Sequence, residues 1–174
     1  DIFNKLTIIV ETDKKEINHP SQNEITVISN GVDDSYFNYK SNKNKEFDII
    51  FSGGMSYAPN SVAAIFLATE IMPLVWEKLP DAKLVIAGAN PTTSVQSLNS
   101  ENIKVTGWVE DMKEYYAKSK IFVAPMQIGT GLQNKLLEAM AMNLPCISSP
   151  LANEALGATH NENILIASSP KEYA

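Results

Sequence analysis

The chain has 174 residues, of which 44% are hydrophobic, and it carries a formal net charge of −6 at pH 7. This length supports one hydrophobic core, and the negative charge argues against nucleic acid as a partner. All 14 basic residues are lysines, so no arginine is available to bind phosphate in a bidentate way, and the single cysteine, Cys146, excludes an internal disulfide or a cysteine-rich metal site.

The first 24 residues differ from those that follow. Leu6–Val10 is an apolar run that predicts an edge strand, whereas residues 11–22 are polar, contain a His-Pro break and are typical of a linker. Another short strand is predicted at Glu24–Ile28. The chain does not begin with methionine, and Ser169–Ala174 reads as a helix that has barely begun. We therefore expect a piece of a longer protein.

From Phe47 onward, apolar runs alternate with helical patterns. The apolar runs predict strands at Asp48–Ser52, Lys83–Ala87, Ile103–Thr106, Ile121–Pro125, Cys146–Ser148 and Ile164–Ala167. Helices are predicted at Asn60–Leu79 with a restart at Pro73, and at Thr93–Leu98, Asp111–Lys118 and Leu132–Asn143. This alternation implies right-handed crossovers and a parallel sheet with helices on both faces. The predicted fold class is α/β, a Rossmann-like domain.

The segment Ile121–Ser149 combines a buried strand, a glycine loop, a helix and a second buried strand. In the loop, Gly129 and Gly131 flank Thr130, and glycines allow backbone N–H groups to come close to a ligand. The helix formers begin at Leu132, directly after the loop. Because a helix start offers free N–H donors and the positive end of a dipole, loop and helix together predict a site for an anion such as a diphosphate.

The polar side of this helix carries the candidate binding residues. At 100° per residue, Asn134, Lys135 and Glu138 share a polar sector within two turns of the helix start. An ionised Glu138 only accepts hydrogen bonds, so it could hold the hydroxyls of a sugar beside the diphosphate. The alternative is that this sector is an ordinary solvated face of an amphipathic helix. The apolar face consists of Leu132, Leu136, Ala139 and Met140.

Gly53 and Gly54 follow the apolar strand that ends near Phe51. In an open α/β sheet, ligands bind beyond the carboxyl ends of the strands, so these glycines are candidates for contact with a ligand. An ordinary tight turn is the alternative reading. The sequence contains neither G-x-G-x-x-G nor G-x-x-x-x-G-K-[ST], so NAD and ATP sites lack their usual motifs.

No metal site is predicted. Asp33 and Asp34 are adjacent carboxylates on a turn, where such pairs are usually solvated. His19 and His160 lie in polar segments without a partner at ligand spacing.

No run approaches the ~18 apolar residues of a membrane span, and the N-terminus lacks the order of charge, apolar block and small residues of a signal peptide. We expect a cytoplasmic protein. A missing portion could still bring the full-length protein to the inner face of the membrane.

Several segments in the order of the chain resemble family 4 glycosyltransferases, the retaining enzymes of the GT-B fold. The resemblance extends from about residue 25 to the end. Within the family, the segment GLQNKLLEAMAM is most similar to sugar transferases associated with exopolysaccharide assembly. The segments that carry it are Ile28–Asp33, Tyr36–Phe37, Phe51–Gly54, Val105–Val109, Lys135–Met142 and Leu144–Ser148.

The resemblance implies that residues 25–174 form a C-terminally truncated nucleotide-sugar-binding lobe, and that residues 1–24 are the tail of a missing N-terminal lobe. It assigns the diphosphate of a UDP- or GDP-sugar to Gly53, Gly54, Gly129, Thr130, Gly131, Leu132, Asn134 and Lys135. It assigns the ribose to Glu138. It assigns the base of the nucleotide to Trp108 and Val109, although Trp108 could instead be a core residue. No cofactor and no metal are implied.

Two departures from the family pattern bear on these roles. The first glycine loop often carries an arginine and a lysine in the family, whereas residues 53–60 contain neither. The family also has two glutamates spaced Glu-x7-Glu; Glu138 matches the second, but Thr130 stands in place of the first. The resemblance therefore supports nucleotide binding better than handling of the donor sugar.

The activity implied is transfer of a hexose from a nucleotide-sugar to a glycan or a lipid-linked acceptor, by a chain that is inactive without its missing lobe. Three alternatives stay open. One is a nucleotide-sugar 2-epimerase of the same fold, and another is a nucleotide-binding module without catalysis. The third, a flavodoxin-like binding domain, leaves the match over Lys135–Met142 unexplained. The catalytic residues are not predicted.

Overall fold

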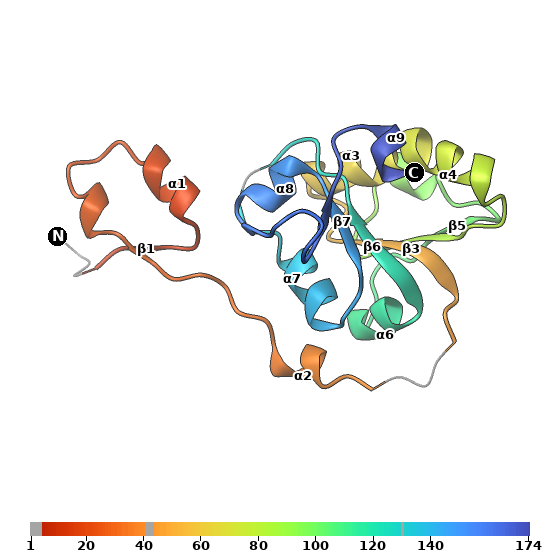
Figure 1. The fold of residues 1–174 in the computed structure, drawn as a ribbon, viewed down its shortest axis with the longest axis horizontal. Helices are drawn as coiled ribbons and strands as arrows, with labels where there is room; N and C mark the ends of the chain where they lie inside the picture. The colour runs from red at the N-terminus through yellow and green to blue at the C-terminus, as the bar shows by residue number, and fades with distance from the viewer. Residues whose placement is uncertain (1–4, 41–43, 130) are drawn as a thin grey trace.

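The computed structural model describes residues 5–40, 44–129 and 131–174. These residues form a small N-terminal unit and a larger α/β domain, joined by an extended segment (Figure 1). The N-terminal unit consists of β1 (Thr7–Ile8), α1 (Glu11–Glu16), a 3₁₀ turn (Gln22–Glu24) and β2 (Thr26–Val27). The connecting segment carries α2 (Asp34–Phe37), whose start is capped by the side chain of Asp33.

The helix α1 corrects the prediction of a linker over residues 11–22. Its first turn contains Glu11 and Asp13 and its last turn Lys14 and Lys15, an order of charges that the helix dipole favours. Because β1 and β2 pair in parallel, the chain between them has to cross over, and α1 lies in that crossover. Because α1 has no buried residues, its sequence shows no periodic spacing of apolar residues from which a helix could be predicted.

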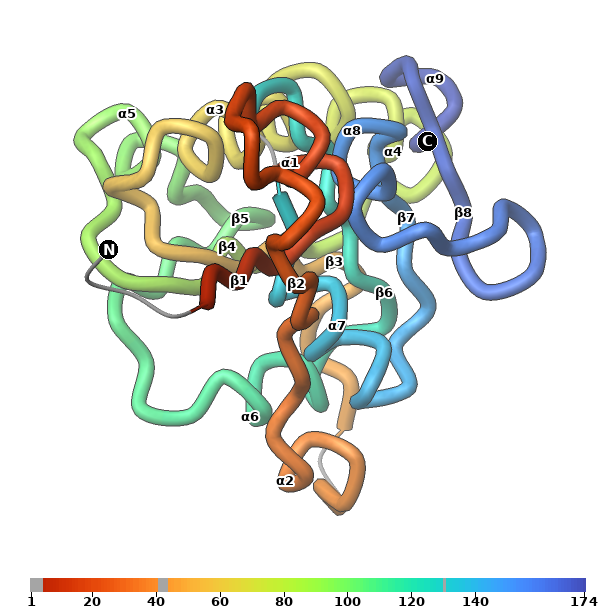
Figure 2. Tube along the Cα trace, turned by 90° about the vertical axis from the view of Figure 1, so that its left-hand side faces the viewer, coloured from red at the N-terminus to blue at the C-terminus, as the bar shows by residue number. Residues whose placement is uncertain are grey.

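The α/β domain contains six strands in one sheet, in the order β5-β4-β3-β6-β7-β8. Every neighbouring pair is parallel. The strands are β3 (Phe47–Ser52), β4 (Leu84–Ala87), β5 (Ile103–Val105), β6 (Ser119–Ala124), β7 (Cys146–Ser148) and β8 (Leu165–Ile166). Figure 2 shows the N-terminal unit in front of this sheet. The order is that of a Rossmann domain, and the predicted parallel α/β sheet is confirmed.

The sheet is covered on both faces, as the absence of alternation in its strands predicts. Figure 1 shows α3 (Ala58–Phe66) and α4 (Met72–Lys78) on one face, and α6 (Met112–Ala117) and α7 (Asn134–Ala141) on the other. The remaining helices are α5 (Thr93–Gln96), α8 (Pro150–Glu154) and α9 (Pro170–Tyr173). Residues of β3 and β4 such as Ile50, Phe51 and Leu84 are fully buried. The core therefore lies on both sides of the central strands.

The predicted helix over residues 60–79 is one helical run, Ala58–Lys78. A π-helical turn, Leu67–Ile71, separates α3 from α4 and ends two residues before Pro73. Proline lacks a backbone N–H and crowds the preceding turn, which a wider turn relieves, so the predicted interruption at Pro73 takes this form.

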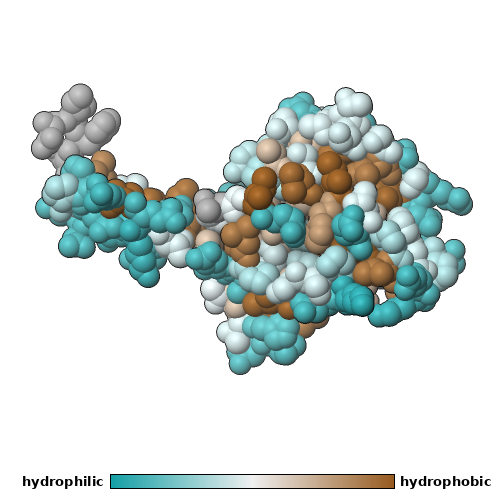
Figure 3. Space-filling model, turned by 90° about the horizontal axis from the view of Figure 1, so that it is seen from above, coloured by the Kyte–Doolittle hydropathy of each residue, from teal (hydrophilic) through white to brown (hydrophobic). Residues whose placement is uncertain are grey.

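Among the described residues, this run is the one helix that is long and apolar enough to cross a membrane by length and composition. Ala63, Leu67 and Ile71 on it belong to the buried core of the domain. Figure 3, which views the molecule from above, shows apolar side chains gathered on this side of the domain as well. The buried part of the run packs on the sheet, as helices of α/β domains do.

The domain boundary predicted at residues 24 and 25 falls within the N-terminal unit, because β2 pairs with β1. The six-stranded sheet begins at Phe47. The assignment of residues 1–24 to a missing lobe and of residues 25–174 to a nucleotide-sugar-binding domain stays a prediction.

Candidate functional site

The order in which strands are added to the sheet reverses between β3 and β6. Strands β4 and β5 follow on the outer side of β3, and β7 and β8 on the outer side of β6. Ligands of open α/β sheets bind at such a switch point, beyond the carboxyl ends of the strands. A groove of about 580 Å³ lies there. It is lined by eight of the predicted site residues: Gly53, Gly54, Trp108, Val109, Leu132, Asn134, Lys135 and Glu138. Segments that are far apart in the sequence thus meet in one groove.

The glycine loop after β6 contributes Leu132 to the groove. Gly129 and Gly131 do not line the groove. Gly129 packs against the start of α3, where an added Cβ would lie 3.0 Å from the side chain of Pro59, and Gly131 faces the carboxylate of Asp13. Thr130 lies outside the described residues. Gly129 is thus closely packed, whereas an added Cβ on Gly131 would make only an ordinary contact. The assignment of this loop to the diphosphate stays a prediction.

The helix α7 begins at Asn134, two residues later than the predicted Leu132. Gln133 has an extended backbone (φ −89°, ψ 90°) and its side chain makes no capping bond to the helix. The helix ends at Ala141, before Asn143 with its positive φ of 56°. Because Leu132 lies outside the helix, Leu136 and Ala139 form the fully buried part of its apolar face. Asn134, the first helical residue, accepts a hydrogen bond from Asn30 at 3.0 Å.

The glycine pair after β3 approaches the end of β4 very closely. An added Cβ on Gly88 would lie 1.9 Å from the carbonyl oxygen of Gly53, and both glycines have positive φ values. On the other side, the buried amide of Asn60 donates to the carbonyl of Gly54 at 3.1 Å. Gly88 and Asn60 were not predicted. Gly88 directly follows an apolar strand, as Gly53 does, and this position after a strand could have identified it as a candidate from the sequence.

Lys135 is the cation of the groove. Its Nζ donates to Oε1 of Gln133 at 2.7 Å and lies 5.8 Å from the centroid of the Phe51 ring. Burial lowers the pKa of Lys135 to about 8, and the charge of Glu138 opposes this shift. Gln133 was not predicted as a site residue. A partly buried ammonium group is stabilised by an anion that binds beside it, which is the property that the diphosphate assignment requires.

Glu138 is partly buried beside Lys135, one turn into the helix. Its Oε2 accepts a hydrogen bond from the hydroxyl of Tyr116 at 3.0 Å. Burial raises the pKa of Glu138, and the Tyr116 hydrogen bond and the charge of Lys135 oppose that rise. Tyr36 of α2 also lines the groove, and burial followed by the charge of Glu138 raises its pKa to about 12. Of the polar sector predicted from the sequence, Lys135 and Glu138 are thus partly buried and Asn134 is exposed. The ligand-binding role of this sector stays a prediction.

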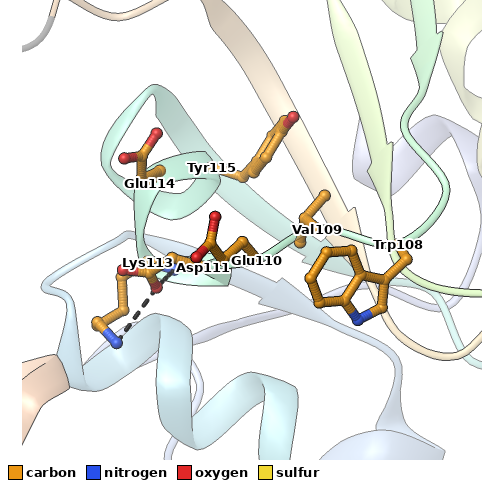
Figure 4. Close-up of a pocket in the computed structure, with 7 residues that line it drawn as sticks. All are labelled: Trp108, Val109, Glu110, Asp111, Lys113, Glu114 and Tyr115. Carbon is orange, nitrogen blue, oxygen red and sulfur yellow. Dashed lines mark hydrogen bonds and ion pairs between the residues drawn. The ribbon is translucent and has the colours of Figure 1, made fainter.

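Trp108 and Val109 lie on the segment between β5 and α6. Trp108 is 73% exposed, so its interpretation as a core residue is wrong. Figure 4 shows its indole ring beside Val109. The ion pair between Asp111 and Lys113, which measures 3.2 Å, lies further along the same segment. The two residues line the groove and also a neighbouring cavity of about 800 Å³. An exposed aromatic ring next to the groove offers a flat surface for a base or a sugar.

The described residues contain no group of three or more His, Cys, Asp and Glu side chains that could hold a metal ion. Nδ1 of His19 accepts from the backbone of Ser21, and Nδ1 of His160 accepts from that of Ile166. Asp33 accepts from the backbone of Ser35 as the cap of α2. A metal-free site stays a prediction.

Comparison with known proteins identifies the relatives of this fold. A family model described as glycosyl transferases group 1 matches residues 46–174. An uncharacterized 44.6 kDa protein in the cps region of Klebsiella pneumoniae is 26% identical over 136 residues, which are 73% of this chain and 35% of that protein. The chain therefore spans about a third of the length of this curated relative.

Three solved structures illustrate the similarity of fold. Anabaena HepE in complex with UDP and glucose has a TM-score of 0.76 at 11% identity, over 97% of this chain and 50% of that chain. A mutant of S. aureus TarM, in complex with Fondaparinux, alpha-GlcNAc-glycerol and UDP, has a TM-score of 0.69 at 17% identity, over 98% and 35%. The C-terminal domain of the group 1 family protein LpcC from Francisella tularensis has a TM-score of 0.60 at 19% identity, over 82% and 83%.

The family match includes every strand of the six-stranded sheet, from Phe47 onward. The solved structures share the Rossmann-like fold, and the relative in a cps region agrees with the predicted likeness to exopolysaccharide-associated transferases. The chain belongs to the group 1 glycosyl transferases, with the fold of the C-terminal domain of the GT-B enzymes.

Proposed function

We propose that this chain is the donor-binding part of a retaining glycosyltransferase that moves a hexose from a nucleotide-sugar to a glycan or a lipid-linked acceptor. The observation that carries the proposal is the groove at the switch point, where Lys135, Glu138 and Trp108 line one space together with the glycine pair after β3. A cation can pair with a diphosphate, a carboxylate can accept from ribose hydroxyls, and an aromatic surface can contact a base.

The residues divide among three parts of the donor. Lys135 holds the diphosphate together with the backbone near Gly53, Gly54, Gly129, Thr130, Gly131, Leu132 and Asn134. Glu138 accepts hydrogen bonds from the ribose, and Trp108 and Val109 contact the base. Lys135 and Glu138 are separated by three positions on α7, so their side chains lie on the same side of the helix. This spacing suits a ribose and its adjacent diphosphate.

In this proposal the protein stabilises the leaving diphosphate without a metal or cofactor. Fixed N–H dipoles and the Lys135 ammonium take up the charge that develops as the sugar departs. The N-terminal lobe supplies most contacts to the acceptor, so the 174-residue chain binds donor weakly and transfers no sugar. The full-length protein works in the cytoplasm or at the inner face of the membrane.

The solved relatives support the nucleotide assignment. HepE and TarM were each solved with UDP, and HepE also with UDP-glucose. Both share the fold of this chain at low identity, so the base stays open between uracil and guanine here. No nucleic-acid partner is expected, because the net charge is −6.

The test is a thermal-shift panel of UDP, GDP, ADP, CMP and their sugars, followed by calorimetry of the best ligand. We expect stabilisation by one ribonucleoside diphosphate, since a ligand that binds the folded state raises its melting temperature. No stabilisation by any of them would contradict the proposal. Interconversion of sugar epimers by the full-length protein without acceptor would instead indicate an epimerase.

A further inference from the structure

We propose that Tyr116 is a positioning residue, whose hydroxyl holds the carboxylate of Glu138 in the orientation that binds the ribose. The inference rests on the proposed function, because it concerns the same groove. Tyr116 lies on α6 and does not line the groove itself. It acts on the ligand only through Glu138.

The Tyr116 hydroxyl connects the two sides of the switch point. It lies 3.0 Å from Oε2 of Glu138 on α7 and 2.8 Å from Oγ of Ser52 at the end of β3. Tyr116 is fully buried, and Ser52 is buried as well. Ser52 directly precedes Gly53, so one hydroxyl links the residue before the glycine pair to the ribose-binding helix. Buried polar groups of this kind have a defined geometry because an unmade hydrogen bond is costly.

The direction of these hydrogen bonds follows from the number of protons. An ionised carboxylate only accepts, so Tyr116 donates its single proton to Glu138, and Ser52 donates to the oxygen of Tyr116. The carbonyl of Lys135, at 3.5 Å, is the more distant acceptor for the same proton. One oxygen of Glu138 is thus held by the protein, and Oε1 is left for the hydroxyls of a ligand.

The ring of Tyr116 is fixed by its neighbours. Its centroid lies 5.9 Å from that of Phe122 on β6, in an edge-on arrangement, and 6.3 Å from that of Tyr36 on α2. The helix that carries it is capped by Asp111, whose carboxylate accepts from the backbone of Lys113 at 2.9 Å. A ring held in this way fixes its hydroxyl, which is the condition for orienting a second group.

The experiment compares Tyr116→Phe with the wild-type chain by calorimetry, using UDP and GDP and their 2′-deoxy analogues. We expect the variant to bind the better ribonucleotide about fivefold more weakly and its deoxy analogue almost unchanged, because a single hydrogen bond orients the group that reads the hydroxyl. In a Glu138→Gln background, Tyr116→Phe should reduce the affinity for the ribonucleotide by a smaller factor than it does in the wild type.

A second measurement follows Glu138 directly by carbon NMR as the pH is changed. The charged and polar groups around Glu138 are Tyr116 and Lys113 on α6, Lys135 on α7 and Tyr36 on α2. The Tyr116 hydrogen bond favours the ionised form, so Tyr116→Phe should raise the pKa of Glu138. A role in packing alone would leave it unchanged.

The control is Tyr173→Phe, which removes the hydroxyl of another buried tyrosine on α9 and should change neither quantity. If Tyr116→Phe does not fold, Ser52→Ala tests the same chain of hydrogen bonds from its other end. Equal losses for both ligands, or no loss with an unchanged Glu138 pKa, would overturn the inference. A wild-type chain that binds no nucleotide overturns the proposed function instead, and the NMR titration then decides whether Tyr116 holds Glu138.

Discussion

The two sides of the groove present different chemical groups to it. On the β3 side, Gly53, Gly54 and Gly88 present backbone and no charge. On the α7 side, Lys135 and Glu138 present charged groups whose pKa values are shifted by burial. The first side is set by steric fit and the second by electrostatics, so we expect substitutions on the first to disturb the fold and those on the second to disturb binding.

The largest effect is expected from Gly88→Ala on the β3 side. The new Cβ would lie 1.9 Å from the Gly53 carbonyl oxygen at a positive φ, so β3 and β4 would have to separate. We expect a loss of more than about 3 kcal/mol in the free energy of unfolding, measured by urea denaturation. Gly54→Ala is the matched control, since an added Cβ there meets no atom within 4 Å. Equal stability of the two variants would show that the close approach is not required.

On the α7 side, Lys135→Ala should weaken binding of a nucleoside diphosphate without unfolding the protein. A hydrogen bond to a charged group is worth roughly 1.5–3 kcal/mol, which corresponds to about 10- to 100-fold in affinity. Lys120→Ala removes a lysine that pairs with Asp48 on the surface and should have no such effect. Calorimetry of both variants makes the comparison. Unchanged affinity in Lys135→Ala would leave the diphosphate to backbone amides alone.

The pH dependence of binding should report the same lysine. Lys135 has a pKa of about 8, so its charge is present at pH 7 and is lost as the pH rises through 8. The phosphates are fully ionised in this range, so affinity should fall by up to about tenfold per pH unit above that point. Lys135→Met should abolish this slope. A wild-type affinity that is flat from pH 7 to 9.5 would contradict the assignment.

The stability of the free protein should change in the opposite direction over this range. The pKa of Lys135 is lower in the folded state than its ordinary value of 10.5, so between about 8 and 10.5 the unfolded chain binds the additional proton. The contribution of Lys135 to stability therefore increases with pH there, and it is unfavourable below pH 8.

The contrast between the two sides also explains what the sequence could predict. The strands were predictable because burial on both faces produces continuous apolar runs, as in Leu84–Ala87. Lys135 and Glu138 were predicted to lie together because residues three positions apart share a helix face, and both line the groove. Both signals are local and periodic.

The residues that were missed depend on contacts across the fold. Tyr116 meets Ser52 across 64 positions in the sequence, and Gly88 meets Gly53 only because β3 and β4 are neighbours. The sequence around a buried tyrosine, or around a glycine after a strand, looks the same whether or not the residue belongs to a binding site. The strand order had to be known before either could be assigned.

A smaller effect is expected for Glu138→Gln. The amide keeps the size of the side chain but replaces one acceptor oxygen with a donor, so ribose hydroxyls lose part of their hydrogen bonding. We expect about a fivefold loss for the ribonucleoside diphosphate and less for its 2′-deoxy analogue, measured by calorimetry. Equal losses for both ligands would remove the ribose role, and no loss at all would return Glu138 to a solvated helix face.

The smallest effect is expected at the contact between the connecting segment and α7. Asn30 donates to the side chain of Asn134 at 3.0 Å, in an exposed position. Because water can replace a partner at the surface, Asn30→Ala should change the free energy of unfolding by less than about 1 kcal/mol and nucleotide affinity by about twofold. Asn38→Ala is the control, since the Asn38 amide bonds within its own segment, to the carbonyl of Asp34. If Asn30→Ala instead weakened binding as strongly as Lys135→Ala, the connecting segment would have to be counted as a third side of the groove, because its contact would then fix the start of α7 for the ligand.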